Sequence, residues 1–247
     1  MDISIYLPLQ FTTQDESEYC AFMTEAYNNF SEQGNYHFAY LAAHILLVYQ
    51  IYLRLWQLAM IKPSRVIDAL SMAHYDSKDG KPHGATLTEI VKNARSPMTF
   101  KIFKIEERIF VKILTLLDNV DYTPFKKAVD FRNTLAHPSG QLALNDVLEF
   151  EKKLDSLQEL MEITHRATKL ILRDYLVDGM KRSRYARPYI QEEVERDIEQ
   201  SFVSPLMMSA YDCALVSGAI VNGTKLEVLI KGYLKKRADE GGYNDED

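Results

Sequence analysis

The stretch that decides the fold is Phe38–Met60, with the sequence FAYLAAHILLVYQIYLRLWQLAM. Its length and apolar character approach those of a membrane-spanning helix, which needs about 20 apolar residues. Polar residues interrupt it at roughly helical spacing, namely His44, Gln50, Arg54 and Gln57. A membrane span would have to place Arg54 near one interface, and no basic flank marks a cytoplasmic side. We therefore favour a helix buried inside a bundle, with no membrane as a partner.

Segments on both sides of this stretch are predicted to form further helices. Glycine and proline are scarce, with 10 and 8 among 247 residues, which favours long helices over many short strands. Asn35 is a candidate N-cap of the long helix, and Pro63-Ser64 opens the helix that follows it. The sequence thus predicts a mostly α fold. The other expected helices are 15–30, 63–73, 86–92 and 100–117, with a loop at 77–84.

The two ends of the chain are where the sequence predicts β structure. Ile3–Leu9 is short and β-prone, which favours an edge strand. Within Leu206–Tyr233, the pair Asn222-Gly223 lies between two apolar runs, which favours a β-hairpin. Thr224 and Glu227 offer an alternative there, because together they match a capping box that opens a helix.

A change of composition after Asp178-Gly179 predicts a domain boundary. We expect residues 1–178 to form the helical bundle and residues 179–247 to form a small C-terminal appendage. The expected parts of this appendage are a basic linker at 180–188, an acidic helix at 189–201, the hairpin, and a disordered acidic tail at 238–247.

Charge and cysteine content bound the class of protein. The net charge of −6 excludes a basic field over the whole surface, so any nucleic-acid site must be local. Cys20 and Cys213 are far apart in sequence and predict neither a disulfide framework nor a metal site. Reduced cysteines, and a start at Met1-Asp2-Ile3-Ser4 without a signal-peptide pattern, lead us to expect a cytoplasmic protein.

The residues that could carry chemistry lie on one predicted helix. Thr123-Pro124 matches an N-cap followed by proline at the first helical position, and Pro138 stops the helix after His137. A further helix, capped by Asn145, is expected to run through Leu176.

A helical wheel of this segment, with about 100° per residue, separates an apolar face from a polar face. The apolar face, expected to point into the core, holds Ala128, Phe131 and Leu135. The opposite face holds Asp130, Asn133 and His137. Arg132 lies beside the polar face, with a side chain long enough to fold over it.

Arg132-Asn133-x-x-Ala136-His137 resembles the R-x4-H signature of HEPN domains (higher eukaryotes and prokaryotes nucleotide-binding). The resemblance implies an α-helical bundle, and many such domains are metal-independent endoribonucleases of toxin–antitoxin, abortive-infection and antiviral-defence systems. In residues it covers about Asp130–His137, and more loosely the bundle over 15–176. One subfamily continues the motif as H-x-Tyr. This chain continues with Pro138-Ser139, which argues against regulation through such a tyrosine.

RNA carries its own nucleophile, the 2′-OH, so cleavage needs a proton acceptor, a proton donor and positive charge at the phosphorane. Imidazole titrates near neutral pH, which suits His137 for proton transfer, and the permanent charge of Arg132 suits it for the phosphate. Asn133 would orient the histidine or the phosphate. Asp130 would do the same, or would simply pair with Arg132.

The resemblance further implies a homodimer in which the two motifs form one composite site. The expected partners are therefore RNA, a second copy of the chain, and a cognate antitoxin or regulatory protein, with no metal or other cofactor. The alternatives are a non-catalytic HEPN-like module that binds nucleotide, RNA or a protein, and a helical scaffold without a ligand.

A second, weaker candidate for RNA contact is a cluster of cations around one aromatic residue. Such a cluster can follow an RNA backbone while the aromatic ring stacks on a base. Its residues are Lys181, Arg182, Arg184, Tyr185 and Arg187. The alternative is a solvated linker between the bundle and the C-terminal part, which is the usual role of a charged run.

Overall fold

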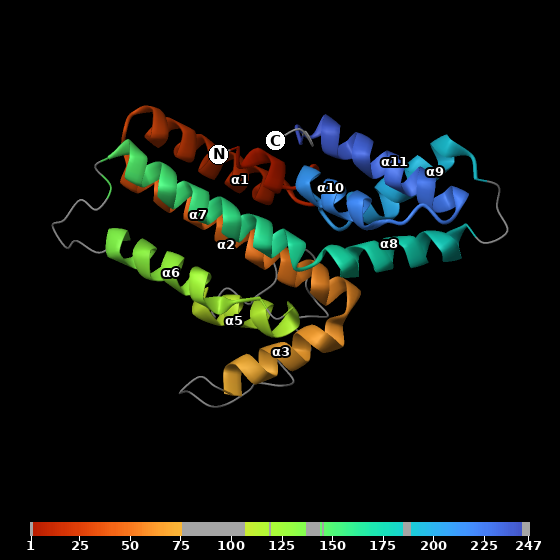
Figure 1. The fold of residues 1–247 in the computed structure, drawn as a ribbon, viewed down its shortest axis with the longest axis horizontal. Helices are drawn as coiled ribbons and strands as arrows, with labels where there is room; N and C mark the ends of the chain where they lie inside the picture. The colour runs from red at the N-terminus through yellow and green to blue at the C-terminus, as the bar shows by residue number, and fades with distance from the viewer. Residues whose placement is uncertain are drawn as a thin grey trace. The chain divides into compact units, whose positions relative to one another are not determined.

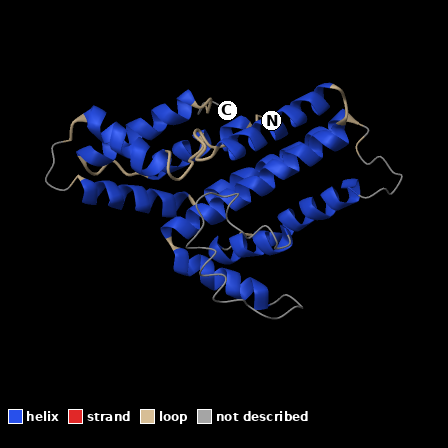
Figure 2. Ribbon diagram, turned by 180° about the vertical axis from the view of Figure 1, so that it is seen from behind, coloured by secondary structure: helices blue, strands red, loops and turns tan. Residues whose placement is uncertain are grey.

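The computed structural model describes residues 2–75, 107–118, 120–136, 144, 146–184 and 189–243. Over these residues the regular elements are helical and no strand is present (Figures 1 and 2). The predicted mostly α fold is confirmed. The loop predicted at 77–84 and the helix predicted at 86–92 lie outside the described residues.

The chain divides into two compact units. The bundle unit is residues 15–164, and the second unit combines residues 2–14 with residues 165–247. The sequence placed the boundary later, at 178. The difference arises because the long helix expected through Leu176 ends early, and the next helix begins at Lys169 with Leu172 and Leu176 buried in the second unit.

Helix α2 (Tyr36–Ile61) is the central helix of the bundle unit, and α3, α5 and α6 pack against it (Figure 1). By length and composition it could cross a membrane, and 78% of its most apolar window is buried inside the protein. The polar residues that interrupt it are buried too. The Arg54 guanidinium donates a hydrogen bond to the side-chain amide oxygen Oε1 of Gln57 over 2.7 Å. Such all-round burial is typical of a core helix.

Four other helices of the bundle unit begin close to the predicted positions, and the predicted helix 100–117 is helical over its described part, from Glu107. Pro63 opens α3, as predicted, whereas the Asn35 side chain makes no capping bond to α2. The capping carboxylate of α6 is that of Asp121, which accepts a hydrogen bond from the Thr123 N–H over 2.9 Å, so the predicted Thr123 cap is wrong. The bounds are α1 Gln14–Glu32, α3 Pro63–Tyr75, α5 Glu107–Asp118, α6 Tyr122–Ala136 and α7 Val147–Arg166.

In the second unit, the predicted hairpin is wrong and the alternative, a helix that begins after Thr224, is correct. The Thr224 hydroxyl accepts a hydrogen bond from the Glu227 N–H over 3.2 Å and opens a helix. Asn222-Gly223 lies in the short connection between the packed helices α10 and α11. The elements are η1 Ser4–Tyr6, α8 Lys169–Ser183, α9 Gln191–Ile198, π-helical η3 Glu199–Val203, α10 Ala210–Ala219 and α11 Lys225–Glu240.

The predicted edge strand at Ile3–Leu9 is wrong as well. This segment forms one 3-10 turn and a single antiparallel bridge between Pro8 and Ser209. The Leu9 N–H donates to the Met208 carbonyl over 3.0 Å. A strand needs a partner strand along its length, and the segment beside this one turns into α10. The expected helix at 189–201 is confirmed, and the expected disordered tail is helical as far as Glu240.

Candidate functional site

Helix α6 turns a different side to the core than the wheel predicted. Phe125, Ala128 and Val129 are its buried residues. Phe131 and Leu135, expected in the core with Ala128, are only half-buried. Steps of three and four residues continue the buried stripe from Ala128 and Val129 to Arg132, which is half-buried. Arg132 therefore lies on the continuation of the buried stripe, about 100° around the helix from Asn133.

The polar face of α6 carries the other two described motif residues. Asp130 is exposed and Asn133 is half-exposed, as expected from their shared face. The Thr134 hydroxyl donates to the Asp130 backbone carbonyl over 3.1 Å, a bond internal to the helix. The structure thus places three motif residues on the last two turns of α6, with Arg132 on a different side from Asp130. His137, which directly follows Ala136 at the end of α6, lies outside the described residues.

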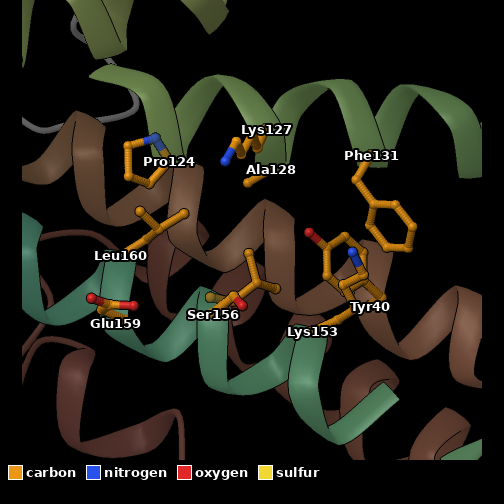
Figure 3. Close-up of a pocket in the computed structure, with 10 residues that line it drawn as sticks. Tyr40, Pro124, Lys127, Ala128, Phe131, Lys153, Ser156, Glu159 and Leu160 are labelled. Carbon is orange, nitrogen blue, oxygen red and sulfur yellow. The ribbon is translucent and has the colours of Figure 1, made fainter. Parts of the chain in front are cut away.

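A pocket opens between α6 and α7, with α2 below it (Figure 3). Its volume is about 210 Å³. Apolar side chains and the Tyr40 phenol form the base of the pocket, and several polar side chains surround them. It is lined by Tyr40, Pro124, Lys127, Ala128, Phe131, Lys153, Ser156, Leu157, Glu159 and Leu160.

Phe131 forms an aromatic wall at one end of this pocket. The Tyr40 ring meets it edge-on, at 4.9 Å between centroids and 87° between planes. The Lys153 ammonium nitrogen lies 4.2 Å from the centroid of the same ring, a cation–π contact. Figure 3 shows the Phe131 side chain extending from α6 toward Tyr40 and α7. The half-burial of Phe131, which the wheel did not predict, is what gives the pocket an aromatic wall.

Two members of the basic cluster after residue 180, Arg184 and Lys181, form ion pairs within the second unit. The Arg184 guanidinium is 2% exposed and binds Glu193 and Asp197, each at 2.7 Å. It therefore joins the end of α8 to α9 and is not presented to solvent, which corrects its assignment as an RNA contact. The Lys181 ammonium binds Glu227 over 2.8 Å, and this hydrogen bond raises the lysine's pKa.

The structure describes one of the remaining members of the cluster. Arg182 is exposed. Tyr185 and Arg187 lie outside the part of the chain that the structure describes. An RNA contact by Arg182, Tyr185 and Arg187 stays a prediction.

A buried polar cluster in the second unit was not found from the sequence. His165 Nδ1 lies 2.9 Å from Asp212 Oδ1, and both side chains are at most 1% exposed. Ser209 and Asp212 form the capping box of α10, and Ser209 Oγ lies 3.5 Å from the same histidine nitrogen. The rings of Tyr6 and Tyr211 pack on the imidazole. The Ser209-x-x-Asp212 spacing was the available signal.

This cluster has the residue types of a catalytic triad without its geometry. In a triad the nucleophile and the carboxylate bind opposite nitrogens of the imidazole. Here Ser209 and Asp212 both approach Nδ1. With the imidazole also fully buried, we assign the cluster to the packing of the second unit and not to catalysis.

Among the described residues, no group of three His, Cys, Asp or Glu side chains is arranged to hold a metal ion. The candidate site consists of the C-terminal half of α6 and the pocket beside it. No protein-family model, no curated protein and no solved structure matches this chain.

Proposed function

We propose that this protein is a metal-independent endoribonuclease of HEPN type, acting as a toxin or antiviral-defence effector. The observation that carries the proposal is the placement of Arg132 and Asn133 on the last turns of α6, inside an all-helical bundle, directly before His137. Helix α6 is held to the bundle by Phe125 and Val129, which are 1% and 4% exposed. A site carried on such a packed helix has a fixed backbone, which positioning of reacting groups requires.

In the proposed reaction, the 2′-OH of one nucleotide attacks the adjacent phosphorus and the bond to the 5′-oxygen breaks. His137 takes the proton from the 2′-OH or gives one to the leaving oxygen. Arg132 neutralises charge on the phosphorane with two N–H donors, and Asn133 or Asp130 orients the other groups. The products are a 2′,3′-cyclic phosphate and a 5′-hydroxyl. One histidine cannot be base and acid at once, so a second copy of the chain supplies the other motif.

The test compares purified wild type with Arg132→Ala and His137→Ala on end-labelled total RNA. We expect both variants to lose cleavage while their helical circular dichroism is retained. His37→Ala, which changes a half-exposed histidine at the start of α2, is the matched control and keeps full activity. Wild-type activity is expected to persist in EDTA. Undiminished cleavage in either motif variant, or a strict need for Mg²⁺, would refute the proposal.

One observation favours a second candidate function, a non-catalytic HEPN-like module that binds RNA. Arg132 continues the buried stripe of α6, and a residue there can serve packing alone. In this case wild type and variants all leave RNA intact, while RNA binding is still measurable. The cleavage assay therefore separates the two candidates.

A further inference from the structure

The α6–α7 pocket is built for a small ligand with an apolar and an anionic part. Its volume of about 210 Å³ is below the ~300–1,000 Å³ that drug-sized ligands occupy. Its base is apolar, formed by Ala128, Leu157 and Leu160, which are at most 9% exposed. Phe131 and Tyr40 add aromatic surface at one end. A single planar ring fits these dimensions and this chemistry, whereas a stack of several rings does not.

Two cations border the pocket, Lys127 from α6 and Lys153 from α7 (Figure 3). In the described part of the chain neither ammonium forms an ion pair within 4 Å, although Lys127 interacts electrostatically with Asp121 and Lys153 contacts the Phe131 ring. Glu159 contributes one carboxylate to the rim, so the rim has a net positive charge. The protein as a whole has a net charge of −6, so the positively charged rim differs in sign from the net charge of the protein. Such a rim attracts an anion where the rest of the surface repels it.

The pocket lies beside the proposed active site on the same helix. Phe131 faces the pocket. Arg132 lies about 100° further around the helix axis, and Asn133 lies about 100° beyond Arg132. Along the axis, Phe131 precedes the end of α6 at Ala136 by five residues, or about 7.5 Å at 1.5 Å per residue. The pocket and the motif residues thus lie within the last turns of the same helix.

We propose that the α6–α7 pocket is a subsite for one nucleotide of single-stranded RNA, with the base against Phe131 and its phosphate between Lys127 and Lys153. The inference rests on the proposed function for the choice of RNA as ligand. Stacking on an aromatic wall suits a base, since every base offers a π-face, and lysines at the rim suit the backbone. An acidic peptide would use the lysines and leave the aromatic wall without a role.

Binding is tested with a fluorescein-labelled 2′-O-methyl RNA oligonucleotide, which lacks the attacking hydroxyl and cannot be cleaved. Fluorescence anisotropy is measured over a range of salt concentrations. For Lys127→Ala/Lys153→Ala we expect about tenfold weaker binding at low salt. The slope of log K against log salt should flatten by about 0.7 for each phosphate that is no longer neutralised by a lysine. Lys126→Ala/Lys152→Ala is the matched control, because these exposed neighbours carry the same charge and do not line the pocket.

A third variant, Ser156→Leu, fills the pocket from an exposed position on α7 without changing charge. Within the described residues, the Ser156 hydroxyl bonds only to the Lys152 carbonyl of its own helix, so folding should be unaffected. We expect weaker binding with an unchanged salt slope. Equal losses in the pocket and control lysine pairs would mean a diffuse electrostatic surface and would overturn the subsite. So would undiminished binding by Ser156→Leu.

The binding assay distinguishes failure of the subsite from failure of the proposed function. Lysine-dependent binding without any cleavage by wild type supports the subsite and refutes the nuclease. Cleavage that depends on His137, together with binding that is indifferent to Lys127 and Lys153, refutes the subsite alone. Absence of any binding to the oligonucleotide overturns the inference directly.

Discussion

The orientation of α6 can be tested with two identical substitutions, Phe125→Ala and Phe131→Ala. Both remove the same side chain from the same helix, so the change in helix propensity cancels between them. In the structure Phe125 is 1% exposed, whereas Phe131 is half-buried at the edge of the pocket. The wheel drawn from the sequence places Phe131 in the core with Ala128 and Leu135, and so predicts a large loss of stability for Phe131→Ala. The relative stability of the two variants therefore reports which side of α6 faces the bundle.

The expected magnitudes follow from these environments. Truncation of a fully buried phenylalanine costs about 3–5 kcal/mol of unfolding free energy, from lost transfer energy and a residual cavity. Phe131 loses only part of that burial, together with an edge-on aromatic pair worth about 0.5–1.5 kcal/mol. Its exposed cation–π contact with Lys153 adds about 0.5–1 kcal/mol. These two contacts account for about 1–2.5 kcal/mol of the cost of Phe131→Ala, and partial loss of burial adds to it; because Phe131 is only half-buried, we expect the total to lie below that for Phe125→Ala.

Urea unfolding followed by tryptophan fluorescence measures both values. Trp56 is the only tryptophan of the chain and lies buried in α2, so its emission reports on the bundle unit. We expect the transition midpoint of Phe125→Ala to lie clearly below that of Phe131→Ala, with equal slopes. A lower midpoint for Phe131→Ala would show that α6 is turned as the sequence predicted. The pocket, and the subsite inferred from it, would then lose their aromatic wall.

Two further predictions concern packing and thiol reactivity. A Cβ at Gly179 in α8 would lie 2.5 Å from the Phe202 ring, so Gly179→Ala should destabilise the protein by about 1–2 kcal/mol net of its propensity gain. Gly232→Ala in α11 meets nothing within 4 Å and should stabilise by up to about 1 kcal/mol; thermal unfolding that ranks the two variants equally would contradict this reasoning. Burial raises the pKa of Cys20 to about 12 and also raises the pKa of Cys213. Native protein at pH 8 should therefore leave a thiol reagent unreacted until urea is added, and rapid native labelling would be inconsistent with the burial of both thiols.

Helices whose signals are local could be predicted from the sequence. Phe38–Met60 is apolar along nearly its whole length, so its burial could be predicted without choosing a face, and α2 has the expected extent. Pro63 opens α3 for an equally local reason, since proline is favoured in a first turn. Where the sequence offered both a turn signal and a helix-capping signal, the preferred prediction was wrong. Asn222-Gly223 favoured a turn between strands, yet the Thr224 cap and the buried positions Leu226 and Ile230 continue as a helix.

Orientation could not be predicted in the same way. On α6, Ala128, Phe131 and Leu135 form a regular apolar face, but so do Phe125, Ala128 and Val129. The second set faces the core because α2 and α5 both pack there. Those contacts come from residues far away in sequence, and no property of the α6 segment encodes them. The pocket was missed for the same reason, since Lys127 and Lys153 are brought together only by packing.

The half-burial of Arg132 bears on its role in the proposed reaction, and the helical wheel did not predict this half-burial. A long arginine on an exposed face loses conformational entropy when it binds a phosphate, and that loss reduces the stabilisation it gives. A half-buried stem at the end of the Phe125–Val129 stripe has already lost part of this freedom in folding. In the proposed reaction this restriction preorganises the guanidinium, which is the property that transition-state stabilisation requires. Packing of the Arg132 stem and its proposed catalytic role are therefore compatible.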